Sequence, residues 1–92
     1  MADITVTINA IDIVSGAFAS SIFIGDGTTV TFNFANAFRP GSLLVFKNGI
    51  FQEKDADYTE TQDRKSITFA VAPKGASGNR TADKVEARYV VD

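Results

Sequence analysis

The sequence contains no cysteine, no histidine and no tryptophan. Without cysteine there are no disulfide bridges and no thiolate nucleophiles, and without either residue there is no Cys/His zinc site and no Ser-His-Asp catalytic arrangement. A chain of 92 residues that lacks bridges and structural zinc depends on its own core or on neighbouring subunits. We therefore expect a structural or attachment protein with no cofactor and no metal, and not an enzyme.

Long apolar runs and a basic excess are also missing. No segment approaches the roughly 20 apolar residues that cross a bilayer, so no membrane segment is expected. The net charge of −2 gives no basic face for nucleic acid. Asp3 stands where a signal peptide carries Lys or Arg, which predicts synthesis and use in the cytosol of the producing cell.

What the sequence has instead is alternation of apolar and polar residues, which is typical of half-buried strands. The Asn48-Gly49 pair is the strongest hairpin signal, because it supplies the two positive φ angles of a type I′ turn. No long helical period occurs. The pattern predicts an all-β fold, either a small antiparallel β-sandwich (jelly-roll-like or Ig-like) or a small barrel. Strands are expected near residues 4–8, 11–13, 22–24, 29–34, 43–47, 50–52, 58–59, 66–69 and 85–91.

The phenylalanines divide into two groups. Four of the eight lie in register with other apolar residues, and we expect them in the core; these are Phe32, Phe34, Phe46 and Phe69. Phe38 stands next to Arg39, and Phe51 follows the Asn-Gly turn, so both are expected to be exposed and to contact a partner.

Charge is distributed unequally along the chain. Residues 1–24 hold 15 apolar residues and only two charged ones, whereas residues 25–92 hold the other 18 charged residues. We therefore divide the chain into an apolar N-terminal segment, 1–24, and a sandwich domain, 25–92. The segment either supplies core strands to its own sandwich or forms a β arm that adds a strand to a neighbour's sheet, with residues 15–21 as a linker. The candidate contact residues are Ile4, Val6, Ile8, Ile11, Ile13 and Phe18, together with Phe38 and Phe51.

Two groups of polar residues are further candidate sites. The carboxylates between Glu53 and Asp63 are interleaved with cations and lack the EF-hand spacing, which favours a solvated, charge-balanced loop over a Ca²⁺ site. The Gly-rich segment 74–80 has no helix after it to bind phosphate, so we interpret it as a loop that is either mobile or in contact with an acidic partner.

From about residue 28 to 90 the chain resembles a small β-domain that recurs in tail fibres and appendages of tailed bacteriophages. The resemblance rests on Thr31-Phe32 with Phe34, Leu44–Ile50 with Gln52, Asp57-Tyr58-Thr59, Ile67-Thr68-Phe69, Ala72-Pro73, and Val85 with Tyr89. Where that family often has a Gly-Asp pair before the last strand, this chain has Thr81–Lys84, so no loop function is carried over.

The resemblance implies a bacteriophage virion structural protein. Because the chain runs from Met1 to Asp92, we expect a free-standing component that docks on capsid, neck or tail proteins as a decoration or adaptor subunit and forms a homo-oligomer. The alternative is a receptor- or glycan-binding module of a tail fibre, acting through the 48–49 hairpin and the loop 74–84.

Overall fold

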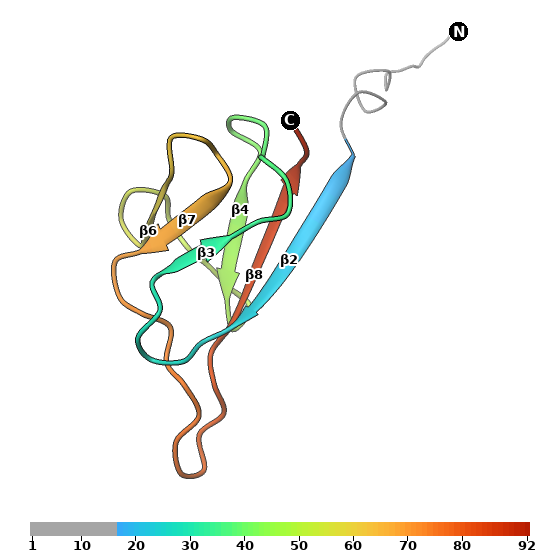
Figure 1. Ribbon diagram of the computed structural model, residues 1–92. Helices are drawn as coiled ribbons and strands as arrows, with labels where there is room; N and C mark the ends of the chain where they lie inside the picture. Colours follow the sequence, from blue (N-terminus) through green and yellow to red (C-terminus); the bar gives the residue numbers. More distant parts are fainter. Residues whose placement is uncertain (1–16) are drawn as a thin grey trace, which may run out of the picture.

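The computed structural model describes residues 17–92, and these residues form strands and loops without any helix (Figure 1). Alternation of side chains produces the strands that the sequence predicts, because each buries one set of residues and exposes the other. The strands are β2 (Phe18–Ile24), β3 (Thr31–Asn33), β4 (Leu44–Lys47), β5 (Ile50–Phe51), β6 (Tyr58–Glu60), β7 (Ser66–Phe69) and β8 (Lys84–Val90). No helix in this part of the chain is long and apolar enough to cross a membrane.

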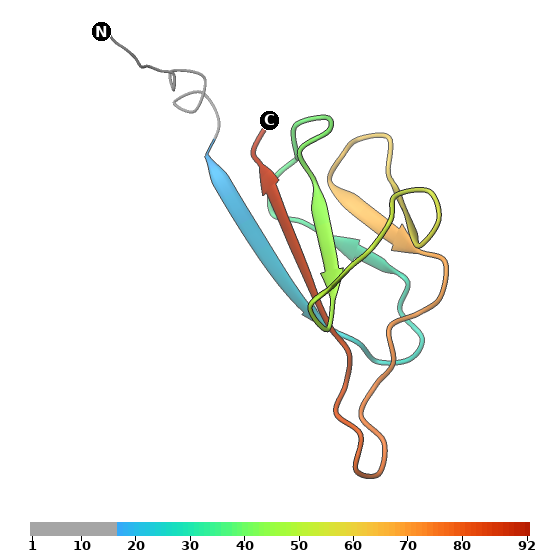
Figure 2. The same cartoon turned by 180° about the vertical axis from the view of Figure 1, so that it is seen from behind.

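The strands form two antiparallel sheets that face each other. The larger sheet has the order β2-β8-β4-β5, and the smaller has the order β3-β7-β6. Figures 1 and 2 show the smaller sheet on one side of β4 and β8, while the long strands β2 and β8 run side by side. The predicted small antiparallel β-sandwich is therefore confirmed.

The core lies between the sheets and is rich in aromatic rings. Phe23 on β2 packs with its ring centroid 5.0 Å from that of Phe32 on β3, and Phe34 lies 5.2 Å from Tyr89 on β8. These contacts join the edge of the larger sheet to the smaller one. The buried apolar residues are Phe32, Phe34, Phe38, Leu43, Val45, Tyr58, Ile67, Phe69, Val85, Ala87 and Tyr89, with Ala19, Phe23 and Val91 packed against them.

The turn between β4 and β5 is the one that the sequence predicts. Asn48 has φ 52° and Gly49 has φ 82°, the left-handed pair of a type I′ turn. Asn48 also accepts a hydrogen bond from the Lys84 backbone N–H on its Oδ1, at 2.9 Å. The hairpin is thus attached to the start of β8.

The first described strand corrects the prediction of a linker at 15–21. From Phe18 onward the chain is strand, and Phe18–Ile24 pairs with Lys84–Val90 along its whole length. The small residues in this strand have weak strand propensity, and pairing with β8 overrides it. The first two residues of the predicted linker, 15 and 16, and the strands expected at 4–8 and 11–13 lie outside the described residues.

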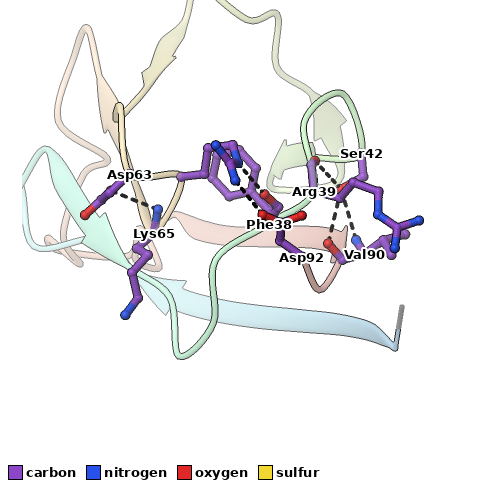
Figure 3. A network of polar contacts seen from close by, with 8 residues as sticks. Phe38, Arg39, Ser42, Asp63, Lys65, Val90 and Asp92 are labelled. Atoms are coloured by element: carbon purple, nitrogen blue, oxygen red, sulfur yellow. Dashed lines mark hydrogen bonds and ion pairs between the residues drawn. The ribbon is translucent and has the colours of Figure 1, made fainter. Parts of the chain in front are cut away.

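Phe38 is fully buried, so the expectation that it is exposed is wrong. The segment that carries it is hydrogen-bonded to the turn between β6 and β7 on one side and to β8 on the other. The Phe38 N–H donates to the carbonyl of Arg64 (2.8 Å), and the Arg39 N–H donates to the carbonyl of Val90 (2.7 Å). Arg64 Nε donates a hydrogen bond to the Phe38 carbonyl (3.0 Å). Ser42 Oγ accepts a hydrogen bond from the Val90 N–H (3.1 Å), and Figure 3 shows part of this network. These bonds turn the Phe38 ring into the core.

Phe46, which was predicted to lie in the core, also needs correction. It is half-buried and lies on the opposite side of the larger sheet from its neighbour Val45, which is fully buried. Both neighbours of Val45 on β4, Leu44 and Phe46, therefore point away from the core.

Gly25, directly after β2, marks a close approach of two backbone segments. Its N–H donates to the carbonyl of Asp83 (2.8 Å). A Cβ at this position would lie 2.6 Å from the Lys74 carbonyl oxygen and 2.7 Å from the Pro73 carbonyl carbon. Both of these are backbone atoms, which cannot move aside as the end of a flexible side chain can. A larger residue at position 25 therefore forces the two backbone segments apart.

We predict that Gly25→Ala lowers the free energy of unfolding by roughly 1–3 kcal/mol, the range typical of overpacking, in urea denaturation. Gly41 is the control, because it has φ 80° and a Cβ added there would meet nothing within 4 Å. Asn adopts that φ readily, so Gly41→Asn should be tolerated while Gly25→Asn should be at least as damaging as Gly25→Ala. Equal tolerance of Asn at both positions would contradict the steric explanation.

Candidate docking face

The candidate site is the side of the larger sheet turned away from the core, which we call the outer face. Strand pairing aligns its residues in rows across the sheet. One row holds Ile22, Glu86, Phe46 and Phe51, each opposite the next on the neighbouring strand. Because partners across a sheet share a face, these four side chains lie on one surface.

The outer face is unusually apolar. Seven large apolar side chains are exposed among residues 17–92, and five of them are on this face. Phe18 is 73% exposed, Ile24 62%, Ile22 57%, Phe51 56% and Leu44 47%. Exposed apolar residues gathered on one surface are typical of interaction sites, whereas scattered ones need no explanation.

The charges at the centre of the outer face are paired within it. Arg88 Nε lies 3.0 Å from Glu86 Oε2, and the Arg88 guanidinium lies 5.9 Å from the centre of the Phe46 ring. Phe46 in turn packs edge-on against Phe51, with centroids 5.9 Å apart. A shallow hollow of about 350 Å³ lies over the junction of β2 and β8, lined in part by Phe18 and Arg88. The face is thus a largely neutral, apolar surface with a shallow depression.

The free edge of β2 borders the outer face. The Gly25 N–H bonds to Asp83, and the Val91 N–H bonds to Ala17, so odd-numbered residues along β2 turn their backbone groups toward β8. Alternation in an antiparallel ladder then turns the N–H and C=O groups of the even-numbered residues away from β8. Those residues are Phe18, Ser20, Ile22 and Ile24, and β2 has no strand on that side among the described residues.

The predicted contact residues are only partly placed by the structure. Phe18 and Phe51 lie on the outer face, at its two ends, and both are exposed. Phe38 is in the core and does not belong to the site. The other five candidates, Ile4, Val6, Ile8, Ile11 and Ile13, lie outside the described residues, as does most of the proposed arm.

Of the five exposed apolar residues on the outer face, three were not predicted as contacts: Ile22, Ile24 and Leu44. Alternation along β2 places Ile22 and Ile24 on the same side of the strand as Phe18, and this pattern is visible in the sequence. The other side of the strand carries Ala19, Ser21 and Phe23. What the sequence does not show is which parity faces the core. Phe23 decides it, because its ring packs on Phe32 and Phe34.

The carboxylates at 53–63 serve local structure. The Asp57 carboxylate accepts from the Glu53 N–H (2.8 Å), and Lys54 forms an ion pair with Glu60 at 3.5 Å. Hydrogen bonds from Thr61 and from the Lys65 N–H hold the pKa of the Asp63 carboxyl below its usual range. Within the described part of the chain, no three acidic residues come together in a way that would hold a metal ion.

A second hollow, of about 250 Å³, lies beside β6 and β7 and is lined by Asp55, Tyr58 and Thr68 among others. Burial, with smaller contributions from Glu60 and Asp55, raises the pKa of the Tyr58 hydroxyl to about 12. A group with that pKa is a poor acid or base near neutral pH.

The chain between β7 and β8 forms a hairpin that projects from one end of the molecule (Figure 1), and Ser77 and Arg80 pair near its tip. Asp83 fixes its base. Its carboxylate accepts from the Lys74 N–H (2.9 Å) and from Asn48 Nδ2 (2.8 Å), and Arg80 lies 3.5 Å away. These hydrogen bonds hold the pKa of Asp83 below its usual range. The hairpin is thereby tied to the 48–49 turn.

Comparison with protein-family models, with curated proteins and with solved structures finds no match to this chain. Its function is therefore inferred from the geometry and chemistry of the outer face.

We predict that Asp83→Asn lowers the free energy of unfolding at pH 7 by roughly 1–3 kcal/mol, the range for hydrogen bonds to a charged group. A carboxyl whose pKa is lowered by folding stabilises the native state above its unfolded pKa of 3.8, and this stabilisation is lost as the pH falls through the lower folded value. The difference between variant and wild type should therefore shrink below about pH 4. Glu53→Gln, on an exposed turn, is the control; a pH-independent difference for Asp83→Asn would contradict the assignment.

Proposed function

We propose that this protein is a structural subunit of a tailed-bacteriophage virion that docks on capsid, neck or tail proteins. The observation that carries the proposal is the outer face, where five apolar side chains are exposed and where β2, at the border, has an edge that no described strand pairs with. Soluble proteins usually protect such an edge with charged residues, Pro or a covering loop, and β2 has no charged residue and no Pro. The resemblance of residues 28–90 to tail-fibre domains supplies the class of assembly.

The proposed mechanism combines apolar burial with strand addition. Burying about 400 Å² of apolar surface at about 25 cal/mol/Å² contributes on the order of 10 kcal/mol before association costs, which offset much of it. Repeated contacts around a symmetric particle then add avidity. Because Phe18–Ile24 belongs to the sheet of its own subunit, only the part of the segment 1–24 that precedes β2 acts as the arm in this proposal. The alternating residues from Ile4 to Ile8 then add a strand to a neighbouring virion protein.

The second candidate function is recognition of a host receptor or glycan. The observation that favours it is the projecting hairpin, which Asp83 ties to the 48–49 turn, so that both present polar and basic groups at one end. Protein sites that hold sugars commonly use an exposed aromatic ring, and none of residues 72–83 is aromatic. The apolar outer face therefore favours assembly over receptor binding.

We predict that the chain is present in particles purified from the phage or prophage that encodes it, and that Phe51→Lys strongly reduces its incorporation. A lysine there places an unpaired charge in the apolar contact. Val71→Lys is the matched control, because Val71 is 69% exposed but follows β7 in the other sheet. Quantitative mass spectrometry of particles measures both, with circular dichroism confirming that each variant folds.

A full-chain variant carrying Ile4→Asp and Ile8→Asp tests the arm in the same assay and should also lose incorporation. Absence of the chain from particles would overturn the proposal. Normal incorporation of the arm and Phe51 variants, together with micromolar binding in a glycan array, would establish the receptor-binding alternative instead.

A further inference from the structure

We propose that the free edge of β2 pairs with the same edge of a second copy of this chain. The two larger sheets would then form one continuous antiparallel sheet across a two-fold axis. This inference rests on the proposed docking function and names a partner for one part of that site, the edge, while leaving the centre of the outer face for another protein.

The edge of β2 is the longest unpaired edge in the described sandwich. β2 has seven residues, whereas the strands at the other sheet edges have two (β5) or three (β3 and β6). Short edge strands are one of the ways in which proteins avoid unwanted pairing, and β2 does not use it. Phe18, Ser20, Ile22 and Ile24 present their N–H and C=O groups along this edge.

The edge is complementary to itself. If the two-fold axis passes at Ser21, antiparallel pairing sets Phe18 opposite Ile24 of the second copy and Ser20 opposite Ile22 of the second copy. All of these are even-numbered, so each facing pair exchanges two N–H···O bonds, and the four pairs give about eight hydrogen bonds. Their side chains share the outer face, so the register keeps apolar residues on one surface in both copies.

Charge and size along β2 suit a symmetric contact. A two-fold axis brings like charges together, and Phe18–Ile24 carries none. The residue on the axis is a serine, which leaves room for its symmetry mate. Phe18 and Ile24, 73% and 62% exposed in the isolated chain, would cover each other at both ends of the pairing.

The decisive experiment uses the absence of cysteine from the chain. In the proposed register Ser21 faces Ser21 of the second copy in a non-hydrogen-bonded pair, with Cα atoms about 4.5 Å apart, which suits a disulfide. Full-length Ser21→Cys should therefore shift, on mild oxidation, from the 9.9 kDa monomer to a band of twice that mass in non-reducing electrophoresis. Ser20→Cys is the matched control, since its symmetry mate is too distant for a direct disulfide, and it should stay monomeric.

A second pair of variants tests the backbone contact. Ser20→Pro removes an N–H from the free edge and leaves the ladder to β8 intact, whereas Ser20→Ala keeps that N–H. Light scattering at about 100 µM should show a dimer for wild type and Ser20→Ala, and loss of the dimer for Ser20→Pro with an unchanged circular dichroism spectrum.

Three results would overturn the inference. They are a monomeric wild type at that concentration, a dimer that survives Ser20→Pro, and equal cross-linking of the two cysteine variants. The last would indicate that another segment, such as residues 4–13, or another face joins the copies. All of these measurements use the isolated protein. A negative result in them would reject the dimer but not the docking function, which the particle experiment tests. A negative result in the particle experiment would reject the docking function but not the dimer.

Discussion

Strand β8 holds the larger sheet together, because it is hydrogen-bonded along both edges, to β2 on one side and to β4 on the other. Its inward residues Val85, Ala87 and Tyr89 are all buried, and they provide the surface on which the smaller sheet packs. β2 reaches the core through this strand and through the ring of Phe23. The smaller sheet covers only one side of β8, and the side left uncovered becomes the outer face.

The uncovered side has the composition of a contact surface. Alternation along a strand requires residues of one parity to leave the core, and in a protein with one solvated face those residues are commonly polar. Here Phe18, Ile22 and Ile24 occupy that parity on β2, and Leu44 and Phe46 occupy it on β4. The paired charges of Glu86 and Arg88 lie between them. The arrangement supports a partner that covers apolar area on both sides of a small polar centre.

Much of the fold was predictable from local sequence. The Asn48-Gly49 turn, β7 and the inward parity of β8 follow from turn chemistry and alternation alone. Phe38 was not predictable, because its burial depends on hydrogen bonds to Arg64 and Val90, which are distant in sequence. The start of β2 was missed for a similar reason: Ala19, Ser20 and Ser21 suggest a linker until β8 is placed beside them. The exposure of Phe51 was predictable because this residue follows a tight turn, and Phe18 became a candidate because it lies in an uncharged segment.

The division of β2 into two sets of residues has a consequence for how such a protein can vary. Odd-numbered residues bond to β8 and face the core, so changes there alter folding. Even-numbered residues carry the outward side chains and the backbone groups that turn away from β8, so changes there leave the fold nearly untouched. In the proposed assembly, substitutions at every second position of this one strand would therefore adjust association independently of whether the subunit folds.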